Sequence, residues 1–378
     1  MTTTHHEIAV IGAGLGGLTF AAVLRRNGID AAVYDLDATS TARDQGGMLD
    51  MHEESGQAAL RAAGRFAEFQ AVIAPGGEAM RILDRHADVR WADDGEDGNR
   101  PEVKRGALRD ILLDTSPEGT VRWNAKITGA RPLGDGRHEV TLAGGSTFTT
   151  DLLVGADGAW SKVRPLVSAA VPEYLGLSFV ETHLLDADTR HPASAALIGT
   201  GSMFALGDGK GFLAHRDSDG GLHIYIALHT QENWINRFDP ATARADLLAH
   251  FTGWDERLLA LLTDADTELV PRSIHALPVG HRWARTPGVT LIGDAAHLMS
   301  PFAGEGANLA MQDGAELAAA IVAHPGDVET ALAAYEAEMF PRSEAAAAES
   351  AANLAISFRA DAPQGMIDQM NMYYSQAT

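Results

Sequence analysis

The first part of the chain alternates apolar runs with glycine-marked stops, a pattern that predicts a strand, a helix and a second strand. Glu7–Ile11 is a short continuous apolar run, which is typical of a buried parallel strand. Leu15–Asn27 repeats apolar residues at helical spacing and ends at Asn27-Gly28, a helix stop signal. Ala31–Tyr34 is again strand-like. A unit of this order and size is typical of a dinucleotide-binding fold.

Further along the chain the pattern changes twice. A helix is expected within Pro101–Ser116, and Asp151–Gly158 has the pattern of a strand that runs into a turn. Between residues 171 and 280, short β-like runs alternate with Gly/Asp turns, which indicates an inserted, mostly antiparallel sheet. Val289–Ile292 returns to buried-strand character, and from Asp327 onward the chain is alanine-rich and helical.

Together these patterns predict an α/β fold with a Rossmann-like nucleotide-binding lobe, an inserted and mostly antiparallel β-sheet lobe, and a C-terminal helix. We expect the nucleotide-binding domain to comprise residues 1–66, 91–170 and 271–325. The substrate-binding domain is expected over residues 67–90 and 171–270, and the C-terminal helix over residues 326–378.

Composition removes several classes of function. The formal net charge of −22 over 378 residues repels phosphate backbones and anionic lipids, so we expect neither nucleic acid nor membrane as a partner. The absence of cysteine excludes disulfides, thiolate metal sites and iron–sulfur clusters. No window approaches about 18 consecutive apolar residues, and the polar start is unlike a secretory signal. We therefore expect a cytoplasmic protein.

A glycine-rich turn follows the first predicted strand and opens the first predicted helix. Gly12 permits the tight turn, Gly14 lets the backbone approach a pyrophosphate, and Gly17 lets the helix pack closely on the strand. The helix N-terminus then offers N–H groups to phosphates. Asp35 ends the second predicted strand, where an acid accepts hydrogen bonds from ribose hydroxyls. The alternative is a structural turn without a ligand.

A second motif stands far along the chain and, with the first, predicts bound FAD. Gly293-Asp294 ends an apolar strand, and Asp294 is suited to accept from a ribityl hydroxyl. The stretch from Gly304 to Asn308 offers backbone N–H groups at a helix start, near the polar edge of a flavin ring. Asp157-Gly158 is a generic turn whose value lies in its position after a strand. We interpret His297 as a structural histidine that packs the turn, with a catalytic base as the alternative.

Other polar residues have two interpretations each. Arg105 and Arg109 lie on one helix face and either face solvent or contact the cofactor. His223 is in the middle of a strand, as a satisfied core residue or a substrate contact, and Glu181 lines either solvent or a polar pocket. We find no metal-ligand spacing and no second G-x-G-x-x-G that follows a strand, so no metal and no permanently bound nicotinamide are expected.

The three glycine and aspartate motifs resemble those of the group A FAD-dependent monooxygenases, and the resemblance covers nearly the whole chain. Several strings look like the tetracycline-inactivating flavin monooxygenases in particular: Gly46 to His52, Ser55 to Gln57, Pro101 to Val103 with Arg105, Ser161 to Arg164, Trp254 to Arg257, and Gly293 to Met299 with Pro301 to Gly304.

The resemblance implies roles for individual residues. FAD would be non-covalent, Pro301 would lie near its oxygen-reactive face, and the C-terminal helix would bridge the two lobes. The predicted cofactor-binding residues are Gly12, Gly14, Gly17, Asp35, Arg43, Asp50, Arg105, Arg109, Asp157, Asp294, Pro301, Gly304, Gly306, Ala307 and Asn308. The predicted substrate-binding residues are Glu181, Phe204, His223, Phe302 and Gly304.

The resemblance also implies the chemistry. NADPH or NADH would reduce FAD transiently, and O₂ would give a flavin C4a-hydroperoxide that hydroxylates a polycyclic aromatic or enolic substrate such as a polyketide. No protein residue is an obligatory catalyst, because phenols and enols ionise readily. A dry cavity is required, with Met203, Phe204, Phe212 and Phe302 as its apolar candidates. A monomer is expected.

Departures from the tetracycline-inactivating pattern affect the substrate half of the site. That pattern has glutamine where Glu181 stands, arginine near Ser202, glutamine in place of Glu305 and methionine near Ser357. We therefore expect tetracyclines to be accepted poorly, unless a neighbouring arginine such as Arg216 substitutes. The remaining alternatives are a biosynthetic polyketide hydroxylase, a flavin dehydrogenase or reductase without oxygenation, a protein that sequesters a polycyclic ligand, and a plain NAD-dependent dehydrogenase.

Overall fold

The computed structural model describes residues 4–42, 46–95 and 100–377, which form two compact units. The first unit comprises Met1–Ile73, Arg105–Glu173 and Ala276–Ser350. The second unit comprises Ala74–Lys104, Tyr174–His275 and Ala351–Thr378. Each unit is therefore assembled from three separate stretches of chain, as expected where segments of one lobe are inserted into the chain of the other.

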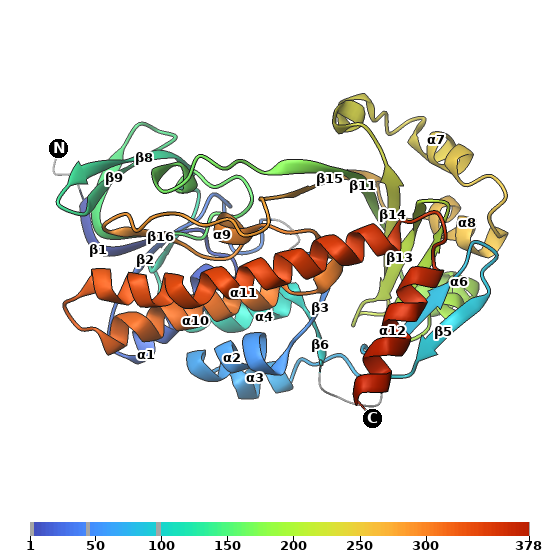
Figure 1. The fold of residues 1–378 in the computed structure, drawn as a ribbon, viewed down its shortest axis with the longest axis horizontal. Coiled ribbons are helices and arrows are strands. Elements are labelled where there is room, and N and C mark those ends of the chain that lie inside the picture. Colours follow the sequence, from blue (N-terminus) through green and yellow to red (C-terminus); the bar gives the residue numbers. More distant parts are fainter. Residues whose placement is uncertain (1–3, 43–45, 96–99, 378) are drawn as a thin grey trace. The chain divides into compact units, whose positions relative to one another are not determined.

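A sheet with a parallel centre forms the core of the first unit (Figure 1). Its strands run in the order β7-β2-β1-β10-β9-β8, and β16 pairs with β10. Their bounds are β1 Thr4–Ile11, β2 Ala32–Tyr34, β7 Val121–Arg122, β8 Ile127–Gly134, β9 Arg137–Leu142, β10 Thr147–Gly155 and β16 Val289–Leu291. The pairs of β1 with β2, β1 with β10 and β10 with β16 are parallel. The predicted strand–helix–strand unit and the Rossmann-like fold class are thus confirmed.

Two helices of the first unit pack unusually closely, α1 (Leu15–Arg26) and α10 (Gly306–Ala323). A Cβ on Gly16 would come within 2.6 Å of the Ala310 carbonyl oxygen, and one on Gly314 within 2.4 Å of the Gly16 carbonyl oxygen. The smaller helices and the short strand are β3 Met48–Asp50, α2 Ala58–Ala63, α3 Phe66–Gln70, α4 Arg105–Leu113 and α9 Asp294–His297, with a π-helical turn at Glu53–Gln57 and 3₁₀ turns at Arg164–Leu166 and Pro301–Ala303. Close contact between α1 and α10 therefore ties the turn before α1 to the helix that begins at Gly306.

The C-terminal region is two helices where the sequence predicted one. They are α11, Val328–Ser357, and α12, Gln364–Ala377. Pro363 stands directly before α12, and a residue that precedes proline is disfavoured in the α conformation, which explains the break. Within the first unit, Tyr335 of α11 donates to the Leu291 carbonyl oxygen at 3.1 Å, so α11 is tied to the end of β16.

The second unit is built on a seven-stranded sheet in the order β15-β11-β14-β13-β12-β4-β5. The bounds of its strands are β4 Met80–Leu83, β5 Val89–Asp93, β11 Glu173–Leu184, β12 Ser202–Gly207, β13 Lys210–Arg216, β14 Leu222–His229 and β15 Val270–Ala276. The short strand β6, Glu102–Lys104, belongs to this unit but not to this sheet. The β11–β14, β14–β13 and β13–β12 pairs are antiparallel. The β12–β4 pair is parallel. The predicted mostly antiparallel sheet is confirmed.

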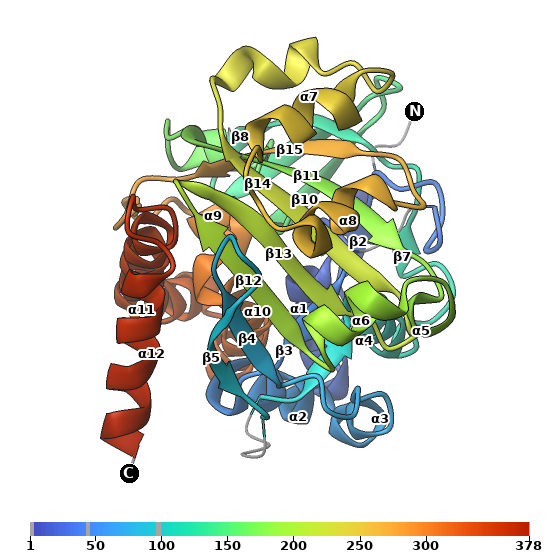
Figure 2. The ribbon, with the colours of Figure 1, turned by 90° about the vertical axis from the view of Figure 1, so that its right-hand side faces the viewer.

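One face of this sheet is covered by helices, as Figure 2 shows for α6 and α8 over β13 and β14. The helices of this unit are α5 Ala187–Arg190, α6 Pro192–Ile198, α7 Ala243–His250 and α8 Glu256–Thr263, with a 3₁₀ turn at Glu232–Arg237. Met203 and Phe212 are fully buried in the core under these helices. Their predicted place on a dry cavity is therefore wrong, because strand alternation turns them toward the helices. Phe204 and His223 point to the opposite face.

Candidate functional site

In the glycine turn between β1 and α1, two glycines are required by close packing and a third leaves open space beside the backbone. Gly12 has φ of +113°, and a Cβ there would lie 2.2 Å from the Ala156 carbonyl oxygen. A Cβ on Gly17 would lie 2.1 Å from the Gly12 carbonyl oxygen. At Gly14, by contrast, nothing lies within 4 Å of the added atom. The turn is thus closed by Gly12 and Gly17 and open at Gly14, where the N–H groups that begin α1 have no intrahelical acceptor.

The three sequence motifs follow three neighbouring parallel strands. Ile11, Gly155 and Leu291 are in direct register at the carboxyl ends of β1, β10 and β16. Gly12, Asp157 and Asp294 come one, two and three residues after these ends, at one edge of the sheet. Ligands of open parallel sheets bind at this edge. The fold therefore brings together motifs that are more than two hundred residues apart in the chain.

Asp35 lies at the same edge, after β2. Its side chain is buried, and its two oxygens accept the backbone N–H groups of Ala13 at 2.6 Å and Asp37 at 2.8 Å. These bonds fix the carboxylate beside the glycine turn. A carboxylate has about four lone-pair sites, so each oxygen retains capacity for a ribose hydroxyl.

Arg109 is a buried support for the turn and not a solvated helix residue. Its Nε donates to the Ala13 carbonyl oxygen at 3.1 Å and Nη1 to the Ser40 carbonyl oxygen at 2.7 Å. Its Nη2 lies 3.5 Å from Asp37 Oδ2. Arg105 begins α4, and its backbone N–H donates to the Gly47 carbonyl oxygen at 3.1 Å. Arg43, also predicted to bind the cofactor, lies outside the described residues.

Asp157 and Asp294 are both acceptors at the sheet edge. Asp157 Oδ2 accepts the Lys162 N–H at 2.6 Å, whereas its Oδ1 is enclosed and has no hydrogen-bond partner in the described part of the chain. Burial raises the pKa of Asp157. Asp294 is exposed where α9 begins, after Gly293, whose φ of +59° and whose approach to Ala310 require glycine. The site thus offers one enclosed and one open carboxylate.

The segment before α10 is held by Asn308. Its Nδ2 donates to the Asp50 carbonyl oxygen at 2.8 Å, and its Oδ1 accepts the His52 N–H at 3.0 Å. Gly304 has φ of +68° and lies against the Asp50 carboxylate. The Asn308 side chain is therefore committed within the protein, and the backbone N–H groups of Gly306 and Ala307 are the donors that α10 presents. Pro301 opens the short 3₁₀ turn before them.

His52 was not singled out by the sequence. Its ring lies between Asp50 Oδ2 at 2.9 Å and Glu305 Oε1 at 3.0 Å. Burial opposes protonation, but the hydrogen bonds and charges of both carboxylates outweigh it and raise the pKa of His52 to about 9. A cation is thus held next to the Gly304–Asn308 segment. A carboxylate at position 305, one of the departures from the resembling family, has a local partner here.

His297 lies in a buried network, in agreement with its structural interpretation. Its Nε2 is 2.6 Å from Asp313 Oδ2, which also accepts the Gly293 N–H at 2.8 Å. Arg342 of α11 contacts the other oxygen of Asp313 at 2.9 Å. The coulombic pull of Asp313, against burial, raises the pKa of His297. This network fixes the turn after β16.

In the second unit, Glu181 and His223 form a pair on the sheet face that the helices leave uncovered. Glu181 Oε1 is 2.8 Å from His223 Nε2, and Oε2 accepts Arg272 Nε at 2.9 Å. The hydrogen bond from His223, reinforced by Arg272 and opposed by burial, lowers the pKa of Glu181 to about 2. Arg272 of β15 was missed by sequence reasoning because it is distant in the chain.

These contacts bear on the charges near the predicted substrate residues. Glu181 does not present an uncompensated carboxylate, since Arg272 pairs with it. Arg216 does not substitute for an arginine near Ser202, because it donates to both carboxylate oxygens of Asp188 at 3.0 Å and to the Gly199 carbonyl oxygen. Of the other predicted substrate residues, Phe204 shares the sheet of Glu181 and His223, whereas Phe302 and Gly304 belong to the first unit.

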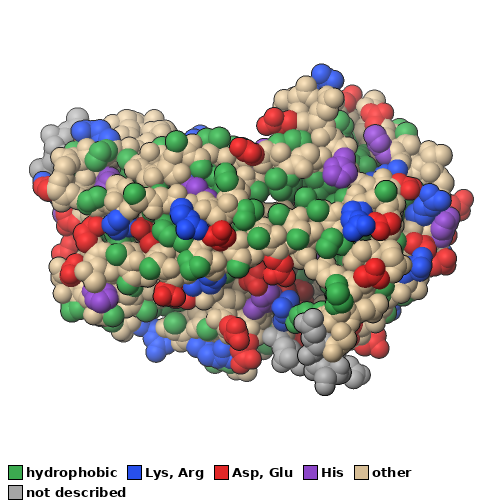
Figure 3. All heavy atoms as spheres, viewed as in Figure 1, with side chains coloured by type: hydrophobic (Ala, Val, Ile, Leu, Met, Phe, Trp, Pro, Cys, Tyr) green, Lys and Arg blue, Asp and Glu red, His purple; other side chains and the backbone are tan. Residues whose placement is uncertain are grey.

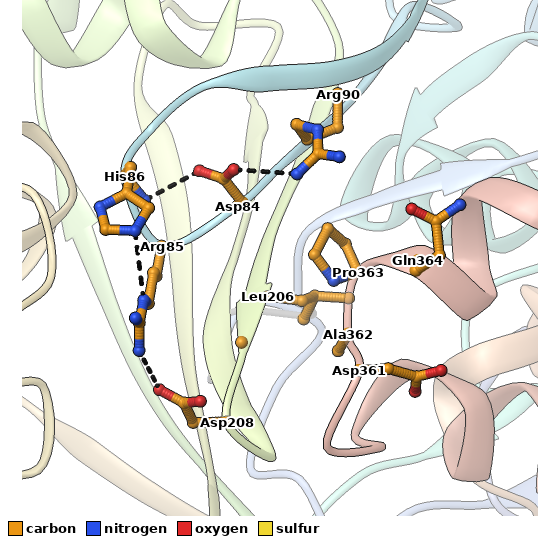
Figure 4. A pocket seen from close by; sticks show the side chains of 11 residues that line it. Asp84, Arg85, His86, Arg90, Leu206, Asp208, Asp361, Ala362, Pro363 and Gln364 are labelled. Atoms are coloured by element: carbon orange, nitrogen blue, oxygen red, sulfur yellow. Dashed lines mark hydrogen bonds and ion pairs between the residues drawn. The ribbon is translucent and has the colours of Figure 1, made fainter.

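A surface hollow of about 290 Å³ in the second unit, drawn in Figure 4, does not contain these residues. Its charged groups pair with one another: Arg90 with Asp84 at 3.2 Å, and Arg85 with Asp208 at 2.9 Å. Pro363 closes it from the α11–α12 connection. Asp361, which also lines it, pairs with Arg359 at 3.1 Å. Because its charged side chains are already paired, this hollow is not favoured as a substrate site.

The surface is in keeping with the acidic composition. On the face that Figure 3 shows, acidic side chains are spread over the surface, and Lys and Arg side chains lie among them. Among the described residues, no helix combines the length and apolar character needed to cross a bilayer.

Comparison with known families identifies FAD as the cofactor of the family to which this chain belongs. Residues 5–350 match the model of a family described as FAD binding domain. The chain belongs to this family. Monooxygenase asqM of Emericella nidulans is 32% identical over 425 aligned positions, covering 93% of this chain and 95% of that protein. Monooxygenase penA of Penicillium thymicola is 29% identical, covering 94% and 96%.

Solved structures agree on the fold. Klebsiella pneumoniae HpxO, complexed with FAD and uric acid, superposes with a TM-score of 0.78 at 23% identity, covering 99% of this chain and 92% of that one. The tetracycline destructase Tet(51) superposes with a TM-score of 0.75 at 20% identity, covering 99% and 96%. The predicted FAD-binding α/β fold and the assignment to the FAD-dependent monooxygenases are confirmed.

Proposed function

We propose that this protein is an NAD(P)H-consuming, FAD-dependent monooxygenase that hydroxylates a polycyclic aromatic or enolic small molecule. The observation that carries the proposal is the alignment of Gly12, Asp157 and Asp294 after three neighbouring parallel strands. An open position at Gly14 and an unpartnered Asp157 oxygen within the described chain at this edge fit a dinucleotide cofactor with hydroxyl groups.

In this proposal different residues of the first unit bind different parts of the cofactor. The N–H groups at the start of α1 would receive the pyrophosphate, and Asp35 the adenosine ribose. Asp294 would accept from a ribityl hydroxyl. The N–H groups of Gly306 and Ala307 would face the polar edge of the flavin ring. His52, held protonated by Asp50 and Glu305, would keep positive charge next to this edge. FAD, when bound, would supply electron transfer from the nicotinamide and the transfer of one oxygen atom of O₂.

The substrate residues would act by orientation. Glu181 is ionised and bound by Arg272, so it fixes His223 with a hydrogen on Nε2. A ring fixed in this way positions a phenol or enol oxygen without being an obligatory base. Phe204 would supply an apolar wall that excludes water. That the relatives asqM and penA are named monooxygenases supports oxygenation over a dehydrogenase or reductase.

The substrate is proposed as a biosynthetic polycyclic compound, with tetracycline as the competing candidate. The tetracycline destructase Tet(51) is only 20% identical to this chain, although the two share a fold. Ser202 leaves no guanidinium on its part of the sheet face, and Arg216 is engaged by Asp188. These features favour a substrate that needs no fixed cation there.

The test is an aerobic assay of the FAD-loaded protein with NADPH or NADH and a panel of polycyclic phenols, enolic polyketides and tetracyclines. The proposal expects substrate-dependent nicotinamide oxidation, matching O₂ uptake, and a product heavier by one oxygen atom. Nicotinamide oxidation that yields only H₂O₂ with every compound, or oxidation without O₂ uptake, contradicts it. Comparison of tetracycline with the other compounds decides between the two substrate candidates.

A further inference from the structure

Three histidines stand side by side on the second unit's sheet, on the face opposite α6 and α8. His183 of β11 is directly opposite His223 of β14, which is directly opposite His215 of β13. Asp217 follows His215 by two residues, which is the spacing that places both on one face of a strand. Four groups able to bind a cation therefore share one part of the sheet, entirely within the second unit.

Three side-chain atoms of this row converge without hydrogen-bond partners. They are His215 Nδ1, His223 Nδ1 and Asp217 Oδ1. Each of the three residues offers one ligand atom, and these ligand atoms lie within 4.8 Å of one another. His215 Nδ1 and Asp217 Oδ1 are 3.3 Å apart. Each atom is enclosed and lacks a hydrogen-bond partner among the residues that the structure describes. The side chains of His223 and Asp217 are only 2% and 8% exposed, so bulk water does not readily satisfy them.

The tautomer of His223 is set for metal binding. Its Nε2 donates to Glu181 Oε1 at 2.8 Å, and Arg272 holds the other carboxylate oxygen. In the tautomer that carries its hydrogen on Nε2, the ring has a lone pair on Nδ1, the atom that has no hydrogen-bond partner among the described residues. A carboxylate behind a histidine is the arrangement that orients metal-ligating imidazoles in known metal sites.

We propose that His215, Asp217 and His223 bind a divalent transition-metal ion such as Zn²⁺ through these three atoms. Two imidazoles and one carboxylate suit zinc and its neighbours better than magnesium or calcium, which prefer oxygen ligands only. Ligands about 2.1 Å from a tetrahedral ion are about 3.4 Å apart, close to the observed spacing of His215 and Asp217. Three protein ligands leave a position for water or a substrate oxygen.

The neighbouring group of Glu181, His183 and His223 is less suited to the ion. Glu181 Oε1 is already bonded to His223 Nε2, and Oε2 to Arg272. Those atoms serve better as the outer support of the site. The site could not be predicted from the sequence, because His223 meets His215 and Asp217 through the β13–β14 register and not through a fixed local spacing.

Metal content of the FAD-loaded protein tests the proposal independently of its enzymatic activity. The protein is treated with a chelator, dialysed against micromolar Zn²⁺ and analysed by inductively coupled plasma mass spectrometry. We expect one Zn²⁺ per chain, which His215→Gln and Asp217→Asn should each abolish. Glu181→Gln should weaken the affinity about 10–100-fold in calorimetric titration, because it removes the outer support. Co²⁺ in place of Zn²⁺ should give the visible d–d bands of a low-symmetry site.

Matched controls separate this site from other histidines. His191→Gln, beside Asp266 in the same unit, and the exposed His5→Gln should each leave one Zn²⁺ per chain. Circular dichroism melting in chelator checks that every variant is folded. If the wild-type chain takes up no Zn²⁺, or if folded His215→Gln and Asp217→Asn proteins retain one ion with unchanged affinity, the proposal is overturned.

Discussion

Gly314 of α10 lies directly against Gly16 of α1: a Cβ on Gly314 would come within 2.4 Å of the Gly16 carbonyl oxygen and 2.9 Å of the Phe20 nitrogen. Both clashing atoms are backbone, so they cannot move aside by a change of rotamer. This contact couples the start of α1 to the helix that begins beside Gly304, the two elements expected to receive opposite ends of FAD. The cofactor edge is therefore as rigid as the α1–α10 packing.

Gly314→Ala should destabilise the protein. Overpacking of this kind typically costs about 1–3 kcal/mol, since the helices must separate. Thermal or urea unfolding followed by circular dichroism measures the loss. Gly129→Ala is the control, because nothing lies within 4 Å of a Cβ at that position. Equal stability of the two variants would show that α1 and α10 are not held as closely as described.

Asp294→Ala should weaken FAD retention without unfolding the protein. The exposed carboxylate is the proposed acceptor for a ribityl hydroxyl, and a hydrogen bond to a charged group contributes about 1.5–3 kcal/mol, or one to two decades in affinity. Flavin fluorescence after dilution measures the Kd. Asp30→Ala, whose carboxylate is 90% exposed on a loop of the same unit, is the matched control and should bind FAD like wild type. An unchanged Kd for Asp294→Ala would remove this residue from the site.

His52 should make stability depend on pH. Its pKa is raised from an ordinary value near 6.5 to about 9 by Asp50 and Glu305. A group whose folded-state pKa is raised stabilises the protein below its unfolded pKa, and this stabilisation is lost as pH rises through the folded pKa. Wild type should therefore lose up to about 3 kcal/mol more than His52→Gln between pH 6.5 and 9.5. Urea unfolding at these two pH values measures the difference. An equal loss of unfolding free energy in both proteins would contradict the raised pKa of His52.

Tetracycline turnover should rise when the two departures from the tetracycline-inactivating pattern are reversed together. Glu181→Gln with Ser202→Arg replaces a paired carboxylate by an amide and adds a guanidinium opposite His215 in the sheet register. One charge-assisted contact is worth about 1.5–3 kcal/mol, so kcat/KM for tetracycline should increase about ten- to a hundredfold. Ser218→Arg, on the exposed turn of the same region, controls for added charge. A specificity constant that is unchanged or lowered in the double variant would refute the role of these positions.

The residues differ in how far the sequence could place them. Gly12, Asp157 and Asp294 were predictable because each follows an apolar strand, and parallel strands bring their carboxyl ends to one edge. The antiparallel sheet of the second unit was also predictable, from its local hydrophobic runs. These features depend on short stretches of chain whose periodicity is visible in the sequence.

What could not be predicted depends on which face of a sheet is covered and on pairs distant in the chain. Met203 and Phe212 were misplaced because both faces of β12 and β13 carry apolar residues, and only the position of α6 and α8 distinguishes them. Arg272 meets Glu181, and His52 meets Glu305, through tertiary packing that leaves no local spacing. The division of the C-terminal region into α11 and α12 was not predicted, because the long alanine-rich pattern obscured the effect of Pro363.

The central claim is that this chain transfers an oxygen atom from O₂ to an organic substrate, and isotope incorporation tests it most directly. The FAD-loaded protein is supplied with NADPH or NADH and a turned-over polycyclic substrate under heavy-oxygen O₂ in ordinary water, and the product is analysed by mass spectrometry. The account predicts one heavy oxygen atom per product molecule and one nicotinamide oxidised per product. A product that carries oxygen from water only, or an oxidised product that has gained no oxygen, would contradict it.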